Sequence, residues 1–147
     1  MGSGDDIDEF IEISKILKVE NKVHFNKKML PLEELIEVIK DMDVGVVSNR
    51  KNIATEIMLP VKMLEYIALD IPVVAPRLKT IEYYFNDEMI TYFQPGEIDS
   101  LAEAVLQLYK NKPKRRKQAL RAKNFIKQYG WENHQKDFIR LYEELLL

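Results

Sequence analysis

The sequence has no cysteine, only two histidines, and few residues that break regular structure, with 5 glycines and 6 prolines in 147 residues. Without cysteine the chain cannot form disulfides, cysteine-containing zinc fingers or a thiol nucleophile. His24 and His134 are far apart and no metal-binding cluster is visible, so we expect no metal and no other cofactor. No run of about 18 apolar residues occurs, and no secretory signal is apparent. We therefore expect a cytoplasmic protein.

The residues that are present describe a folded chain. Hydrophobic residues make up 46% and charged residues 31%, which predicts a single domain over residues 1–147. The formal net charge of −2 does not call for a polyanionic partner. Nine basic residues nevertheless lie between Lys110 and Lys127, with no acidic residue among them. This run is either a solvated helix face or a peripheral contact with an anionic inner membrane surface. Nucleic acid is disfavoured, because no platform of aromatic side chains interleaves the basic residues.

The chain alternates between extended and helical patterns. Asp5 or Asp6 is expected to cap the first helix, Asp99 or Ser100 a later one, and Gly130 to end a helix in the left-handed conformation. Strands separated by helices imply parallel pairing, so we expect an α/β fold with a parallel sheet covered by helices on both faces. The expected strands span 23–25, 44–47, 71–76 and 89–93, and the expected helices 7–17, 31–42, 60–69, 101–109, 114–128 and 132–146.

One expected helix carries an unusual pair of charges. Lys62 falls in the first turn after Pro60, where a cation opposes the helix dipole unless an anion binds there. Glu65 lies on the same helical face, and a carboxylate can accept two hydrogen bonds from a vicinal diol such as ribose. Phosphate and diol together describe a nucleotide. The alternative is an ordinary surface ion pair at i,i+3 spacing, worth about 0.2–0.5 kcal/mol.

The order of motifs along the chain resembles a known family. The run LPVKMLEYIALDIPVVAP is similar to the segment P-x-K-x-x-E-Y-x-A-x-G-x-P-V-V of the group-1 (family 4) retaining glycosyltransferases of GT-B architecture, in their C-terminal nucleotide-sugar-binding domain. Upstream, GSG, KVHF and PLEELIEVIKDMDVGVVSN follow the same family succession. Downstream, FQPGEIDSLAEAVLQLY and YGWENHQKDFIRLYEELL also resemble family elements. The resemblance covers nearly the whole chain.

This resemblance implies a function and a site. The fold would be the Rossmann-like half of a GT-B enzyme that moves a sugar from a nucleotide-diphosphate sugar to an acceptor, in polysaccharide or glycolipid synthesis. Glu65 would hold the ribose, and Lys62 would stabilise the leaving diphosphate. The remaining predicted site residues are Leu59, Pro60 and Val61 at the diphosphate, Asn26 and Lys27 near the base, and Ser48, Asn49 and Thr55 beside the diphosphate or donor sugar.

The chain also departs from the family pattern. Ile57 stands where the first glutamate of the family's Glu, seven residues, Glu pair is expected, and Asp70 and Asn26 replace usual glycines. The first strand-helix-strand unit of the domain and the N-terminal domain are not found. We therefore expect a partial domain that is inactive alone and that needs a partner chain, the missing domain or self-association. The alternative is a non-catalytic α/β regulatory or partner-binding module.

Overall fold

The computed structural model describes residues 6–146. By its internal contacts the chain divides into two compact units, Met1–Val38 and Ile39–Leu147, which are described separately. The single domain expected over 1–147 remains a prediction. No helix in the described residues is long and apolar enough to cross a membrane.

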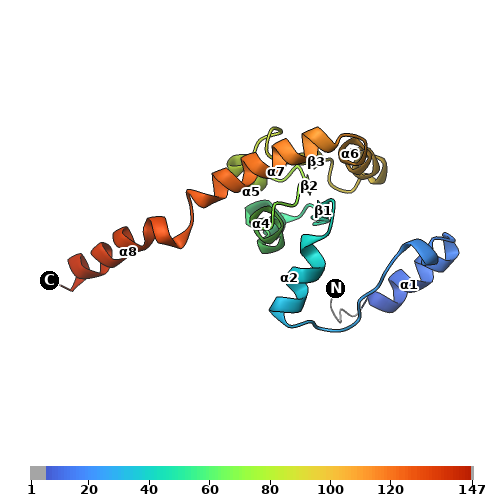
Figure 1. Ribbon diagram of the computed structural model, residues 1–147, viewed down its shortest axis with the longest axis horizontal. Coiled ribbons are helices and arrows are strands. Elements are labelled where there is room, and N and C mark those ends of the chain that lie inside the picture. Colours follow the sequence, from blue (N-terminus) through green and yellow to red (C-terminus); the bar gives the residue numbers. More distant parts are fainter. Residues whose placement is uncertain (1–5, 147) are drawn as a thin grey trace. The chain divides into compact units, whose positions relative to one another are not determined.

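The described part of the first unit contains helices and no strand. Helix α1 spans Ile7–Ile16, the short 3₁₀ helix η1 spans Glu20–Lys22, and α2 (Leu32–Lys40) begins in this unit and continues into the second (Figure 1). Asp6, one of the two predicted positions, is the N-cap residue of α1, but its side chain makes no capping hydrogen bond. Asp5 lies outside the described residues.

The predicted strand at 23–25 is also wrong. These residues adopt no regular structure, and Val23 and His24 are exposed. A strand needs a neighbour for its backbone N–H and C=O groups, and none of the described strands pairs with this segment. Alternating apolar residues alone therefore do not make a strand here.

The second unit is built on a parallel sheet. Strands β1 (Gly45–Val46), β2 (Val73–Pro76) and β3 (Thr91–Phe93) lie in the order β1-β2-β3. Gly45 pairs with Val73, and Val74 pairs with Thr91, both in parallel register. The three predicted apolar strands of this unit are thus confirmed, although each is shorter than the sequence indicated.

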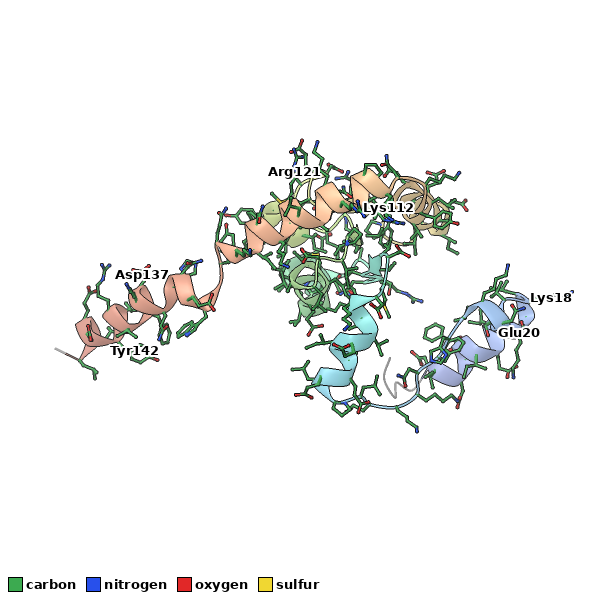
Figure 2. The ribbon with its side chains drawn as sticks, viewed as in Figure 1. Lys18, Glu20, Lys112, Arg121, Asp137 and Tyr142 are labelled. Carbon is green, nitrogen blue, oxygen red and sulfur yellow. The ribbon has the colours of Figure 1, made fainter. Side chains whose placement is uncertain are left out.

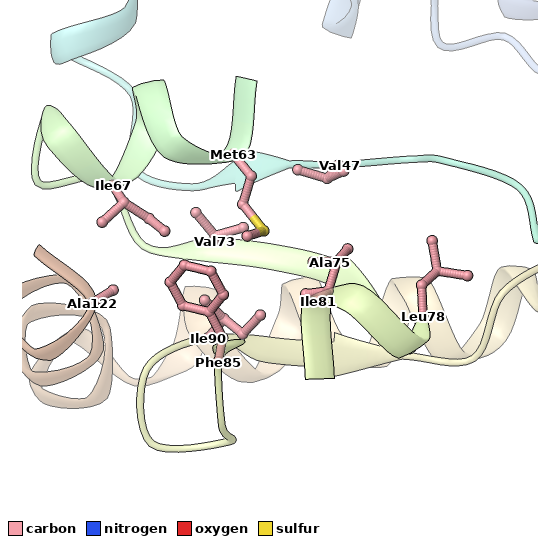
Figure 3. Packing of buried hydrophobic residues seen from close by; sticks show 10 residues of the cluster. All are labelled: Val47, Met63, Ile67, Val73, Ala75, Leu78, Ile81, Phe85, Ile90 and Ala122. Carbon is pink, nitrogen blue, oxygen red and sulfur yellow. The ribbon is translucent and has the colours of Figure 1, made fainter. Parts of the chain in front are cut away.

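Helices cover both faces of this sheet. Val73 and Ala75 of β2 point to one face, where they pack with Met63 and Ile67 of α4 (Val61–Ala68) and with Ile81 (Figure 3). Helix α5 (Lys79–Tyr84) contributes Ile81, and Ala122 comes from α7 (Lys112–Lys127).

Val74 points to the opposite face of the sheet. There it packs with Phe93 of β3 and with Ala104 and Leu108 of α6 (Ile98–Lys110). Alternate residues of one strand thus enter two separate cores, which confirms the expected α/β class.

Several helix ends differ from the sequence prediction. Gly130 has φ −63° and ψ 146°, so it does not end α7 in the left-handed conformation but precedes α8 (Trp131–Leu145) as its N-cap residue. The chain leaves α7 through successive i,i+3 bonds instead, in which the amides of Gln128 and Tyr129 donate to Phe125 and Ile126. These bonds satisfy the last carbonyls without a positive φ.

The cap of α6 also differs. Glu97 is its N-cap residue, and Asp99 lies in its first turn. The Ser100 hydroxyl accepts a hydrogen bond from the Gln94 amide at 2.9 Å, so this side chain orders the turn before the helix. Asp70, in contrast, has φ 61° and occupies the left-handed region that its place after α4 predicted. The sequence analysis missed α5 and the short helix α3 (Ile53–Ile57).

The core between α4 and the sheet leads to a stability prediction. Ile67 is fully buried, whereas Ile98 at the start of α6 is 83% exposed. Ile67→Ala should lower the free energy of unfolding by about 2–5 kcal/mol, because it removes buried methyl groups and leaves a cavity. The same change at Ile98 should be within about 0.5 kcal/mol of the parent. Urea denaturation followed by circular dichroism compares them, and equal losses would contradict the packing described.

Candidate functional site

Helix α4 begins at the carboxyl edge of the sheet. It connects β1 to β2, which are parallel, so the helix must run back against the strand direction. The segment after β1, residues 47–60, and the segment after β2, residues 77–79, leave the sheet at this same edge. In parallel α/β sheets, ligands bind beyond the carboxyl ends of the strands.

Lys62 and Glu65 are both exposed on α4. Lys62 is the second residue of the helix, and Glu65 lies three residues further on. Within residues 6–146, neither side chain makes a hydrogen bond or an ion pair. The i,i+3 ion pair that offered the ordinary explanation for these two charges is therefore not formed.

The residues before Lys62 divide between the core and the surface. Pro60 is buried and caps α4 with extended backbone (φ −67°, ψ 122°), whereas Val61 is 68% exposed. The side chain of Leu59 lines an apolar cavity of about 350 Å³, together with Leu64 and Phe125. Lys62 and Glu65 do not line this cavity. An anion at the start of α4 would therefore meet backbone amides and Lys62, not the Leu59 side chain.

The loop after β1 is held by a capping box. The Thr55 amide donates to Asn52 Oδ1 and the Asn52 amide donates to Thr55 Oγ1, both at 2.9 Å. The Thr55 hydroxyl also donates to the Arg50 carbonyl at 2.7 Å. Ser48 is exposed and Asn49 half-buried just after β1. The structure thus brings Ser48, Asn49 and Thr55 to the edge from which α4 begins, with the Thr55 hydroxyl already used to shape the loop.

Glu56 joins the loop after β1 to the loop after β2. Its Oε2 accepts a hydrogen bond from the Lys79 amide at 3.1 Å, and its Oε1 lies 3.2 Å from Lys51 Nζ. Its backbone carbonyl accepts from the Thr80 hydroxyl at 2.8 Å. The bond from the Lys79 backbone is the main cause that lowers the pKa of Glu56. Since Lys79 is the first residue of α5, the carboxylate also complements the dipole of that helix.

Sequence analysis did not foresee this role for Glu56. The sequence did contain a signal for this role, because Glu56 lies one place before the position at which the family pattern has the first glutamate of its pair. Ile57 occupies that position and is 78% exposed. A carboxylate therefore lies next to the expected position, but it is bound to Lys79 and Lys51.

Arg77 is a second residue at this edge that sequence analysis missed. It follows β2 directly, and its guanidinium lies 2.9 Å from Glu82 Oε1 and 2.7 Å from Asp87 Oδ1. The guanidinium carbon also stands 4.5 Å from the centre of the Tyr92 ring. The bond to Glu82 is the main cause that raises the pKa of Arg77, and burial raises the pKa of the Tyr92 hydroxyl. Two carboxylates already offset the charge of Arg77, unlike that of Lys62.

The remaining predicted site residues, Asn26 and Lys27, belong to the first unit. Asn26 Oδ1 accepts a hydrogen bond from the Lys28 amide at 3.0 Å, and Lys27 Nζ lies 2.8 Å from Asp8 Oδ1. Lys27 lowers the pKa of Asp8. In the described residues no group of three acidic or histidine side chains could hold a metal ion.

Comparison with protein families identifies the chain. Residues 1–111 match the family model described as "Glycosyl transferases group 1". The chain belongs to this family. The resemblance found in the sequence is thus confirmed, and this glycosyltransferase chain has the Rossmann-like α/β architecture of a GT-B half. Comparison with curated proteins gives no match.

Solved structures support the fold of this glycosyltransferase chain. Sucrose-phosphate synthase from Thermosynechococcus elongatus superposes with a TM-score of 0.73 at 16% identity, over 95% of this chain and 34% of that one. A glycosyltransferase from Rickettsia africae gives 0.74 at 16% identity, over 95% and 36%. The C-terminal domain of a group 1 family glycosyl transferase from Francisella tularensis gives 0.70 at 18% identity, over 84% and 63%. The chain thus spans about a third of the length of the first two structures.

The Glu56 contacts lead to a prediction about acid stability. The pKa of Glu56 is lower in the folded chain than its ordinary value of 4.5, so its contribution to stability is present above that pH and is lost as the pH falls further. Glu56→Gln should reduce the part of the acid-induced loss of stability that occurs below about pH 4.5. Thermal melts from pH 7 to pH 3 test this. Glu103→Gln, an exposed change on α6, is the control, and identical pH profiles for both variants would contradict the role of Glu56.

Proposed function

We propose that this chain binds the nucleotide-diphosphate sugar donor of a hexosyl-transferring enzyme. The observation that supports the proposal best is the pair Lys62 and Glu65, exposed at the start of α4, free of partners in the described residues and located at the carboxyl edge of a parallel sheet. Membership of the group-1 glycosyltransferases supports the same class of ligand. The acceptor would be a growing polysaccharide or a glycolipid.

In this proposal Lys62 contacts the diphosphate. The first-turn amides of α4 carry partial positive charge, and Lys62 adds a full charge at the same end of the helix. A diphosphate gains negative charge as the bond to the sugar breaks. Fixed positive groups at this point stabilise the transition state more than the ground state. Lys62 would therefore act as a catalytic residue through leaving-group stabilisation, with no covalent role.

Glu65 holds the ribose in the same proposal. Its carboxylate has two acceptor oxygens, and a cis-diol has two donors at matching spacing. One helical turn separates Glu65 from Lys62, which suits a ribose attached directly to the diphosphate. Ser48, Asn49 and Thr55 would border the diphosphate or the sugar.

The donor sugar lacks one contact that the family pattern would supply. Ile57 cannot accept hydrogen bonds from sugar hydroxyls, and the neighbouring Glu56 is bound to Lys79 and Lys51. Recognition of the nucleotide is therefore better supported than recognition of the sugar. The same departure favours the second candidate function, a non-catalytic module that kept the nucleotide-binding shape.

The role of Glu65 predicts a selective loss of affinity. Glu65→Gln should weaken binding of a nucleoside diphosphate about tenfold to a hundredfold, because hydrogen bonds to a charged group are worth about 1.5–3 kcal/mol. Calorimetric titration with UDP, GDP and ADP identifies the base first. The variant should then bind the corresponding 2′,3′-dideoxynucleotide as well as the parent does. An equal loss for the ribo- and dideoxy-forms would contradict a contact with the diol.

The role of Lys62 is tested with a different part of the ligand. Lys62→Ala should weaken binding of the nucleoside diphosphate about tenfold or more and leave the affinity for the free nucleoside unchanged. Lys136→Ala, an exposed change on α8, serves as the matched control. If none of the three diphosphates binds to the parent chain, a non-catalytic partner-binding module without a nucleotide site becomes the better explanation.

A further inference from the structure

Helix α7 has a fixed inner side. Gln118, which is 3% exposed, accepts a hydrogen bond from the Thr91 hydroxyl at 3.0 Å and donates to the carbonyls of Ile90 and Asp87 at 3.0 and 2.9 Å. Ala119 and Ala122 are buried beside it. These contacts determine which residues of α7 face the sheet and which face outward.

Three basic residues of α7 are ion-paired with the body of the unit. Arg115 Nη2 lies 3.1 Å from Asp43 Oδ1, Arg121 Nη1 lies 2.7 Å from Glu88 Oε2, and Lys123 pairs with Asp70. The three acidic partners share one feature, since each lies two or three residues before a strand: they are Asp43 before β1, Asp70 before β2 and Glu88 before β3. The α7 helix therefore contacts the amino ends of all three strands.

A second set of basic residues on α7 has no such partners. Lys112, Arg116 and Lys117 make no ion pair within the described residues. They line a shallow depression of about 530 Å³ with Pro113 and Leu120. These five residues follow i, i+1, i+4, i+5 and i+8 spacing, which places them on one side of the helix, and we call them the basic stripe. Figure 2 labels Lys112, the first of them, at the start of α7.

We propose that the basic stripe docks on the surface of an anionic lipid bilayer. Lys112, Arg116 and Lys117 would contact headgroup phosphates, while Leu120, which is 59% exposed, would enter the interface between headgroups and acyl chains. Basic side chains at the start of α7 oppose the dipole of that helix, so an anion at this end relieves an unfavourable arrangement. This inference does not depend on the nucleotide site.

The chemistry of the basic stripe favours lipid over nucleic acid. Nucleic acids without sequence preference are bound by basic grooves with aromatic side chains on which bases stack. The basic stripe contains no aromatic residue, and its non-basic members are Pro113 and Leu120. An exposed leucine flanked by cations gains more from a bilayer interface than from a phosphate backbone.

Sedimentation with vesicles tests the three charges. The full chain should partition to vesicles of phosphatidylglycerol and phosphatidylcholine, and only weakly to pure phosphatidylcholine. The triple variant K112Q/R116Q/K117Q should lose about a hundredfold in partition coefficient. The control K22Q/K28Q/K136Q removes the same charge from exposed positions elsewhere and should partition like the parent. Equal loss in both triple variants would overturn the proposal, because it would reveal attraction by net charge alone.

A second variant separates lipid from other sources of phosphate. Leu120→Ser keeps every charge, so it should lower partition to anionic vesicles several-fold and leave any binding of poly(U) unchanged. Unchanged vesicle binding would overturn docking through the basic stripe, as would tighter binding of poly(U) than of vesicles. Competition by millimolar inorganic phosphate at constant ionic strength would indicate a free-phosphate site and would also overturn it. Circular dichroism melts check that each variant is folded, and loss of parent binding with added salt gives a test without any variant.

Discussion

The burial of β2 on both sides is the constraint on which the second unit depends. This strand is hydrogen-bonded to β1 and β3, and residues 73–76 are all buried. A strand in this position forces helices onto both faces, because its alternate side chains point to two opposite apolar layers. Because β1 and β2 are parallel, the chain must run back from the carboxyl edge to the amino edge of the sheet between them, and it does so through α4. Helix α4 therefore begins at the carboxyl edge. The locations of Lys62 and Glu65 follow from this topology.

The charges at the carboxyl edge fall into two kinds. Arg77 and Glu56 are bound to other protein groups: Arg77 to Glu82 and Asp87, and Glu56 to the Lys79 amide, which joins the loop after β1 to the start of α5. Lys62 and Glu65 have no such contacts in the described residues. A charge that supports a loop is offset by its partners, whereas a charge without partners is available to a ligand at little cost. This difference distinguishes the α4 pair from Arg77 and Glu56 at the same edge.

Sequence analysis succeeded where one local pattern determines the structure. The apolar runs VGVV and IPVVAP predicted β1 and β2, since such runs are typical of strands in a parallel sheet. Burial on both faces holds for β2, whereas Val46 of the edge strand β1 is exposed. The pattern V-H-F at 23–25 failed because a strand also needs a partner, which local sequence does not reveal. Helices α3 and α5 have five and six residues, too few to show helical periodicity. The role of Glu56 could not be predicted from local sequence, because Lys79, whose amide donates to its carboxylate, lies 23 residues further along the chain.

The ion pairs of α7 with Asp43, Asp70 and Glu88 have a geometric consequence. Through Arg115, Arg121 and Lys123 they attach α7, the helix that bears the basic stripe, to residues just before the amino ends of the strands. Helix α4 begins at the opposite, carboxyl edge of the same sheet. In the two proposals, attachment to a bilayer and binding of a nucleotide would use opposite edges of the same sheet. A chain docked through the basic stripe would then keep the carboxyl edge away from the bilayer, so it could exchange its ligand without first detaching.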